Sequence, residues 1–273
     1  MTRKNIVTGA IKAMAVSLGL LSSSLAVAAD MPGVSDTEIR IGNTAPYSGP
    51  ASSYSVIAKA HAAYFEMINR AGGINGRNSP PKTVEQTRRL VEGDDVLLVT
   101  QIVGTPPNAA VQRYMNQRKV PHLFAASGAK KFSDPANFHW TMGWNPTLYN
   151  EGKIYAKYLL ENHPDATIGV LYQNDDYGKE VLQGLRDGLG EAAERMVVAE
   201  ESYETSAPTV DSQIVKIRST GATVFFNVAT SKAAAQAIRK VHELNWKPIH
   251  ILNSVSNSVG AVLEPAGLEA SKD

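Results

Sequence analysis

The sequence predicts an α/β protein with two doubly wound parallel-sheet lobes joined by a hinge. Three observations predict this fold class. Apolar runs such as residues 96–99 are continuous rather than alternating, which is typical of strands buried on both faces of a parallel sheet. Amphipathic helical patterns separate successive runs. The alternation of strands and helices restarts near residues 140–150, so the chain divides into two units there.

The first unit begins with a strand at residues 38–42, which enters a loop at 43–53. Apolar and aromatic side chains then recur at helical spacing from Tyr54 to Ile68. Pro80 and Pro81 are expected to open a second helix, and Asn108 is expected to cap a third. The intervening strands are predicted at residues 96–99 and 120–124.

The second unit repeats this rhythm. Helices are predicted around residues 154–159, 181–189, 210–217 and 234–241. Strands are predicted at residues 167–172, 196–199, 223–228 and 248–252. Ligands of such sheets lie at the carboxyl ends of strands and between lobes, so the loops there are the candidate binding segments.

Residues 1–29 have the three-part pattern of a secretory signal peptide. Arg3, Lys4 and Lys12 precede an apolar stretch at 13–21, and small residues follow as far as Ala29. We expect the mature chain to begin at Ala29 or Asp30 and to lie in the periplasm, with 24 basic and 26 acidic residues. No other run reaches 18 apolar residues, which argues against a membrane span.

Several function classes lose their main support. The chain has no cysteine, which excludes disulfides, thiolate zinc sites and a lipid-bearing cysteine. Its 27 basic and 26 acidic residues give no charge excess for nucleic acid. Neither the dinucleotide-binding motif Gly-x-Gly-x-x-Gly nor the P-loop motif Gly-x-x-x-x-Gly-Lys-Ser/Thr occurs. Ala126-Ser127-Gly128 lacks the first glycine of the nucleophile elbow Gly-x-Ser-x-Gly. The six histidines have no metal-ligand spacing. We therefore predict no catalytic residues, no metal and no cofactor.

Polar loops follow six of the predicted strands. They lie at residues 46–50, 104–108, 125–129, 174–178, 227–232 and 253–257. Each is rich in hydroxyls, amides and small residues, often just before a helix N-terminus, which attracts carboxylates. Any one loop is explained by ordinary turn and cap chemistry, and Asp175-Asp176 is expected to cap the following helix. Six such loops after successive strands indicate a ligand site.

Four motifs in order carry a resemblance to a known family. They are residues 47–50 (YSGP), 69–77 (NRAGGINGR), 79–86 (SPPKTVEQ) and 174–179 (NDDYGK). Through these motifs and their order, residues 36–270 resemble the branched-chain-amino-acid-type (leucine/isoleucine/valine-binding) substrate-binding proteins of ABC importers. These are class I periplasmic binding proteins. The resemblance implies a non-catalytic, monomeric receptor that closes two lobes on a small carboxylate-bearing ligand and presents it to a membrane permease.

The resemblance also implies the site residues. In lobe one, the ligand carboxylate is expected at the Thr105 hydroxyl and at the loop formed by Ala126, Ser127 and Gly128, with Tyr54 covering the ligand. In lobe two, Tyr177 matches the family's tyrosine before glycine, and Asn227 and Ser254 are expected to contribute from the polar loops at 227–232 and 253–257.

The family's acidic anchor for a ligand ammonium would lie near Asn253 or Ser254, where this chain has no acid. This absence favours an aromatic or aliphatic acid over an α-amino acid.

The chain departs from the family pattern in two places. Arg77-Asn78-Ser79 joins two motifs that a strand and an acidic turn separate in the family, so we expect lobe one, residues 30–145, to lack one strand near 77–79. Family members also continue beyond the position of Asp273, so residues 146–273 are expected to hold lobe two and the start of a return crossover. An incomplete lobe one predicts weak ligand binding and faster hydrogen exchange than in lobe two.

Two alternatives stay open. A sensory ligand-binding domain that reports to a membrane receptor would bind the same ligands, and genomic neighbours would separate it from a transport receptor. A secreted α/β hydrolase would require turnover that depends on Ser127 or Asp176.

Overall fold

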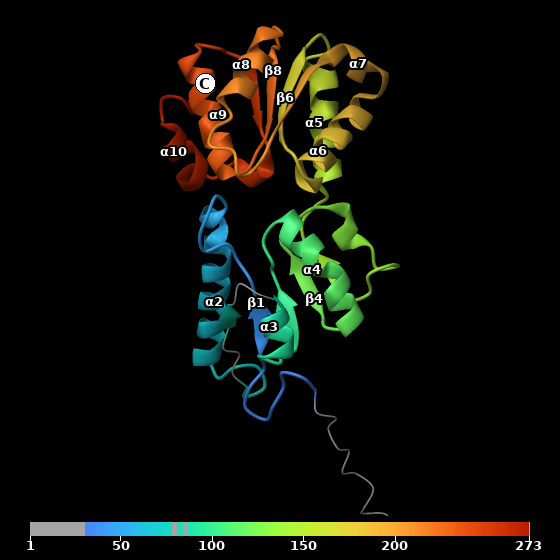
Figure 1. Ribbon diagram of the computed structural model, residues 1–273, viewed down its shortest axis with the longest axis vertical. Coiled ribbons are helices and arrows are strands. Elements are labelled where there is room, and N and C mark those ends of the chain that lie inside the picture. The colour runs from blue at the N-terminus through green and yellow to red at the C-terminus, as the bar shows by residue number, and fades with distance from the viewer. Residues whose placement is uncertain (1–30, 78–80, 84–86, 273) are drawn as a thin grey trace, which may run out of the picture.

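In the computed structural model, residues 31–77, 81–83 and 87–272 are described, and they form two α/β lobes stacked end to end (Figure 1). Lobe one contains a five-stranded sheet of order β2-β1-β3-β4-β5, and lobe two a four-stranded sheet of order β7-β6-β8-β9. Every pairing of named strands is parallel, which confirms the predicted fold class. The predicted signal peptide at 1–29 and the junction at Asn78-Ser79 lie outside the described residues.

Lobe one is built from very short strands. They are β1 (Ile41–Asn43), β2 (Pro81–Thr83), β3 (Leu98–Thr100), β4 (His122–Ala125) and β5 (Thr141–Gly143). Its helices are η1 (Ser52–Tyr54), α2 (Ser55–Arg70), α3 (Thr87–Glu92), α4 (Thr105–Arg118) and η2 (Lys130–Ser133). The fully buried core beneath α3 and α4 is small and consists of Leu90, Val96, Val99, Ile102 and Met115.

The segment after the first glycine turn differs from its prediction. Pro81–Thr83 forms β2 and pairs with β1 along its whole length, and helix α3 begins only at Thr87. The expected helix start at Pro81 is therefore wrong, and a three-residue strand lies at the sheet edge beside β1. The expected deletion near residues 77–79 falls mostly outside the described residues and stays a prediction. A proline disfavours helical backbone in the residue before it, and an edge strand tolerates proline at its first position.

Two further elements of lobe one were misplaced or missed. Helix α4 begins at Thr105 rather than after Asn108, because Gly104 takes a φ of 96° as its N-cap and Pro106 and Pro107 follow in the first turn. Strand β5, which pairs with β4, was not predicted. The linker of residues 144–147 follows it and contains the expected lobe boundary at 145/146.

Lobe two follows the predicted alternation closely. Its principal elements are α5 (Leu148–Asn162), β6 (Ile168–Gln173), α6 (Asp176–Leu189), β7 (Val197–Tyr203), α8 (Asp211–Ser219), β8 (Val224–Val228), α9 (Ser231–Glu243) and β9 (Ile249–Leu252). Short helices complete it: η3 (Gly190–Ala192), α7 (Ala193–Met196), η4 (Ser254–Ser256), η5 (Val259–Leu263) and α10 (Glu264–Ala266). Among the described residues, no helix has both the length and the apolar character needed to cross a membrane.

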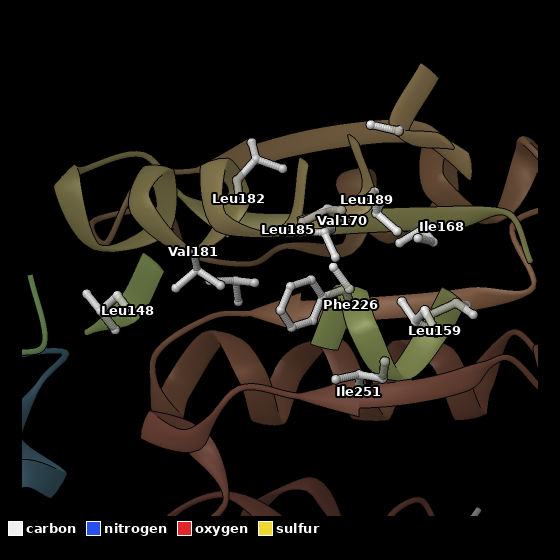
Figure 2. Packing of buried hydrophobic residues seen from close by; sticks show 14 of the residues in the cluster. Leu148, Leu159, Ile168, Val170, Val181, Leu182, Leu185, Leu189, Phe226 and Ile251 are labelled. Carbon is white, nitrogen blue, oxygen red and sulfur yellow. The ribbon is translucent and has the colours of Figure 1, made fainter. Parts of the chain in front are cut away.

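Adjacent residues of β8 anchor the two halves of the lobe-two core. Phe226 packs with Leu159, Val181 and Leu185 under α5 and α6 (Figure 2). Phe225 points to the opposite face and packs against the α8 and α9 side. Burial on both faces of β8 explains why its sequence is continuously apolar apart from Asn227.

Helices α5 and α6 approach each other closely through glycine. A Cβ atom on Gly184 would lie 2.0 Å from the carbonyl oxygen of Tyr149, and one on Gly152 would lie 2.2 Å from that of Val181. Both contacts are with backbone, which cannot move aside as a side chain can. The two glycines therefore set the spacing of this helix pair.

The linker between the lobes is fixed to the loop after β4. The Leu148 amide donates a hydrogen bond of 2.9 Å to the carbonyl oxygen of Gly128. A Cβ atom on Gly128 would lie 2.4 Å from the carbonyl oxygen of Pro146, so this contact requires glycine. Trp144, 66% exposed, packs edge-on against Phe124 with 5.5 Å between ring centroids. The loop that carries Ser127 is therefore attached directly to the interlobe linker.

Candidate functional site

Most of the hydrogen bonds and ion pairs between the lobes come from segments that follow strand carboxyl ends. In lobe one they come from Tyr54, after β1, and from the segment after β4. In lobe two they come from segments after β6, β8 and β9. Strand order reverses at β1/β3 and at β6/β8, so these segments lie at the topological switch points, where doubly wound sheets bind ligands.

Thr105 and Ser127 form the centre of the lobe-one side. Their hydroxyl oxygens lie 2.7 Å apart, and both residues are buried. The Ser127 hydroxyl also accepts a hydrogen bond of 3.2 Å from the Ala129 amide. The loops of these residues are joined because the Gly104 amide donates to the carbonyl of Ala126 at 3.1 Å. Thus the structure brings together Thr105 and the predicted loop of residues 126–128.

The N-terminus of α4 supplies few amide donors of its own. Pro106 and Pro107 have no N–H, and the Asn108 amide donates to the Gly104 carbonyl at 3.3 Å. A carboxylate at this end of the helix would therefore depend on the Thr105 amide and on the two hydroxyls. This arrangement makes the hydroxyl pair the main chemical feature of lobe one.

A buried pair of polar side chains supports this loop from behind. Asn108 donates from Nδ2 to the carbonyls of Ile102 and Gly104, at 2.6 and 2.7 Å. Its Oδ1 atom lies 2.7 Å from Nε2 of His122, which must therefore donate. The Nδ1 atom of His122 is buried and has no partner among the described residues. Burial lowers the pKa of His122 to about 4, so the ring is neutral.

Tyr54 crosses between the lobes. Its hydroxyl donates to the carbonyl of Val255 at 3.0 Å and accepts from the amide of Ser231, the first residue of α9, at 3.2 Å. Tyr54 was expected to cover a ligand, and in this structure its hydroxyl is used to contact lobe two. Covering the ligand with its ring remains a prediction.

The side chain of Tyr177 hydrogen-bonds to Asn253. The hydroxyl of Tyr177 is buried and donates to Oδ1 of Asn253 at 2.7 Å. The same oxygen accepts from the Val255 amide at 3.3 Å, which fixes the orientation of the Asn253 side chain. Burial raises the pKa of Tyr177 well above its ordinary value, so the phenol stays protonated.

Ser254 contacts an acid that the sequence did not reveal. Its amide and hydroxyl donate to the two oxygens of Glu151, at 2.8 and 3.0 Å. Tyr155 also donates to Glu151, at 3.1 Å. Glu151 lies in the first turn of α5, 103 residues before Ser254. The region near Asn253 and Ser254 therefore has a carboxylate, supplied by a distant helix.

Unlike the other predicted site residues, Asn227 lies inside a strand. It lies inside β8, is fully buried, and its Nδ2 atom is 3.2 Å from Nε2 of His250 on the adjacent strand β9. Side chains alternate along a strand, so Asn227 shares the α9 face with Phe225. The structure therefore separates its side chain from Thr105, Ser127 and Tyr54.

Comparison with known proteins identifies relatives of this architecture. A family model described as periplasmic binding protein matches residues 38–272. The Leu/Ile/Val-binding protein homolog 3 of Brucella melitensis is 23% identical over 250 residues, which are 86% of this chain and 66% of that protein. Homolog 7 of Brucella suis is 21% identical, over 85% of this chain and 62% of its own length.

Solved structures share the same fold. A substrate-binding periplasmic protein from Ralstonia solanacearum superimposes with a TM-score of 0.75 and 26% identity, covering 85% of this chain and 68% of that one. A fatty acid ABC transporter substrate-binding protein from Thermomonospora curvata gives 0.72 and 18%, covering 86% and 63%. A branched-chain amino acid transporter substrate-binding protein from Streptococcus pneumoniae, in complex with isoleucine, gives 0.73 and 18%, covering 86% and 69%.

Proposed function

Because the chain belongs to the periplasmic binding protein family, we propose that it is a non-catalytic receptor in the periplasm. In this proposal its two lobes enclose a small carboxylate-bearing ligand and deliver it to the permease of an ABC importer. The chain spans 62 to 66% of the length of the curated relatives described above. Ligand binding and delivery to a permease are therefore proposals for this chain. The observation that carries the proposal is the buried hydroxyl pair of Thr105 and Ser127 at the end of the sheet that faces lobe two.

The chemistry of the pair suits a carboxylate. Two hydroxyls 2.7 Å apart can turn both hydrogens toward one anionic oxygen pair. Hydrogen bonds to a charged group contribute about 1.5–3 kcal/mol each. A site of this kind needs no cationic side chain, and the Asn108–His122 pair keeps the supporting loop in place.

Whether the ligand carries an amino group depends on Glu151. We expected an acid without an amino group, because no acid stands in the chain near Asn253 or Ser254. Glu151 removes that premise, because its carboxylate lies within hydrogen-bond distance of Ser254. Of the solved structures with this fold, one is a complex with isoleucine, and another is described as a fatty acid ABC transporter substrate-binding protein. We therefore propose both branched-chain amino acids and plain aliphatic or aromatic acids as ligand candidates.

Thermal unfolding with defined ligands tests this function. Leucine, 4-methylpentanoic acid and phenylacetic acid differ in the amino group and in ring content. A ligand at about 100 times its dissociation constant stabilises the fold by about 2.7 kcal/mol. If the protein prefers leucine to 4-methylpentanoic acid and Glu151→Gln abolishes this preference, Glu151 binds the amino group of the ligand. Failure of the whole acid series to raise the melting temperature would contradict the proposed function.

Thr105→Ala provides the site-specific test. Loss of one charge-assisted hydrogen bond is expected to weaken binding roughly ten- to hundredfold. Thr37→Ala, which removes an exposed hydroxyl from the same lobe, is the matched control and should leave the dissociation constant unchanged. Equal affinities for Thr105→Ala and the unaltered protein would show that the loop has only a structural role.

The hydrolase alternative receives no support from the surroundings of Ser127. The hydroxyl of Ser127 contacts the Thr105 hydroxyl and the Ala129 amide, and no histidine among the described residues hydrogen-bonds to it. Asp176 forms an ion pair with Lys131. A nucleophilic serine needs a base within hydrogen-bond reach. The sensory alternative shares the same ligand site and differs only in its membrane partner.

A further inference from the structure

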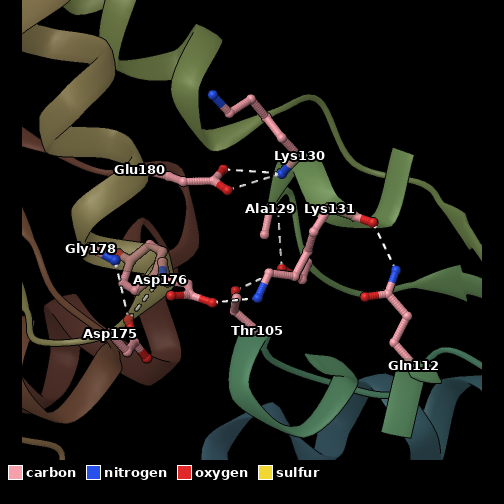
Figure 3. A network of polar contacts seen from close by, with 11 residues as sticks. Thr105, Gln112, Ala129, Lys130, Lys131, Asp175, Asp176, Gly178 and Glu180 are labelled. Carbon is pink, nitrogen blue, oxygen red and sulfur yellow. Dashed lines mark hydrogen bonds and ion pairs between the residues drawn. The ribbon is translucent and has the colours of Figure 1, made fainter. Parts of the chain in front are cut away.

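A polar cluster joins the lobes on the side of η2 and α6 (Figure 3). The Lys131 ammonium lies 2.5 Å from Oδ2 of Asp176. The Lys130 amide donates to both carboxylate oxygens of Glu180, at 3.2 and 3.1 Å. Asp176 and Glu180 are four residues apart on α6 and therefore share one face of that helix. Two consecutive residues of lobe one thus contact two acids on one face of a lobe-two helix.

Both sides of this contact are held in position. On the lobe-one side, Gln112 donates to the carbonyl of Lys131 at 2.8 Å, and Phe132 is buried in the core. On the lobe-two side, Asp175 caps α6 by accepting from the amides of Tyr177 and Gly178, at 3.0 and 3.2 Å. The backbone on both sides of the contact is therefore held in position, so the ion pair forms between two segments that are already ordered.

Each side of the contact is also continuous with a candidate ligand residue. Ser127 lies three residues before Lys130, and its hydroxyl accepts from the intervening Ala129 amide. Tyr177 directly follows Asp176 in α6. A relative movement of the lobes that separates Lys131 from Asp176 must therefore change the spacing of the two sides of the proposed ligand site.

We propose that the Lys131–Asp176 ion pair and the hydrogen bonds from the Lys130 backbone amide to the Glu180 carboxylate form an electrostatic clasp that holds the two lobes closed when no ligand is bound. The clasp sets the fraction of ligand-free protein in the closed arrangement. If the proposed function holds, it also adjusts ligand affinity, because a receptor whose closed state is already populated needs less binding energy to close.

The absence of cysteine makes a distance measurement straightforward. Gln117→Cys on α4 and Lys157→Cys on α5 place one spin label on each lobe, at exposed positions. Double electron–electron resonance on ligand-free protein then reports the distribution of interlobe distances. Lys131→Asp places two negative charges together and is expected to lower the ratio of closed to open protein roughly two- to fivefold, in the range for loss of an exposed pair. In the unaltered protein, 0.5 M salt is expected to act in the same direction.

The charge-swapped double variant Lys131→Asp/Asp176→Lys should restore the closed population. Lys216→Asp breaks an ion pair with Glu201 inside lobe two and should leave the interlobe distances unchanged. If Lys131→Asp does not fold, Glu180→Gln is the second variant, since it removes charge but keeps an acceptor oxygen. An unchanged distribution of interlobe distances in Lys131→Asp would overturn the clasp. If Lys131→Asp does not fold, an unchanged distribution in Glu180→Gln would do so. An equal shift of the distances in Lys216→Asp would also overturn it. No ligand is present, so this result is independent of the thermal-unfolding test of function.

Discussion

His122 makes the stability of lobe one depend on pH. The side chain is fully buried, its Nε2 atom is committed to Asn108, and its Nδ1 atom has no acceptor among the described residues to receive a second N–H. A proton added at Nδ1 would place a buried charge with no compensating partner. This environment lowers the pKa of His122 from 6.5 to about 4, and its cause is burial.

The sign of the effect follows from the two pKa values. The unfolded chain takes up a proton on this histidine near pH 6.5, whereas the folded chain does so only near pH 4. The contribution to stability is therefore fully present above pH 6.5 and is lost as the pH falls toward 4. At about 1.4 kcal/mol for each pH unit of this interval, the loss amounts to about 3.5 kcal/mol. This is a large part of a typical stability of about 5–15 kcal/mol.

Urea unfolding followed by circular dichroism between pH 7.5 and 4.5 measures this dependence. His122→Gln is expected to be less stable at neutral pH but to lose about 3 kcal/mol less than the unaltered protein over the acid range. His139→Gln, which changes an exposed histidine of the same lobe, is the control. If His122→Gln and the unaltered protein lose stability in parallel, the argument from the buried Nδ1 atom is wrong.

Two further substitutions test the packing of lobe two. Gly184→Ala is expected to destabilise the fold by about 1–3 kcal/mol, because its Cβ would meet the backbone of Tyr149. Gly260→Ala, whose Cβ would have no neighbour closer than 3.9 Å, should be tolerated in the same urea titration. Asp175→Ala removes the cap of α6 and should lower the melting temperature by an amount equivalent to about 1 kcal/mol, whereas Asp165→Ala at an exposed turn should not.

Sequence reasoning predicted lobe two better than lobe one for a physical reason. The strands of lobe two are long enough to give continuous apolar runs, as at residues 168–173 and 224–228. Strands β2 and β5 of lobe one have three residues each, and β2 begins with proline. Strands β1 and β3 are equally short, but each overlaps a longer pattern, at residues 38–42 and 96–99. Three residues alone are too few to show a period, so β2 was taken for a helix start and β5 was missed.

The candidate site was predicted in part. Thr105 and Ser127 follow neighbouring parallel strands, so their meeting can be expected from strand order once the fold class is known. Glu151 was missed because its contact with Ser254 joins segments 103 residues apart, which no local pattern records. Asn227 was placed at the end of a strand and in the loop that follows, although it lies within β8, where alternation turns its side chain away from Thr105, Ser127 and Tyr54.

The positions of the tryptophans make the intrinsic fluorescence of the protein sensitive to movement of the interlobe linker. The chain has three tryptophans, and two of them, Trp140 and Trp144, flank β5 at the entrance to the interlobe linker. They are 38% and 66% exposed, whereas Trp246 packs against Phe225 in lobe two. A hinge movement would change the polarity around the first pair and the edge-on contact of Trp144 with Phe124. In a Trp246→Phe background, emission wavelength and quenching by iodide would then report the linker alone, without any attached dye.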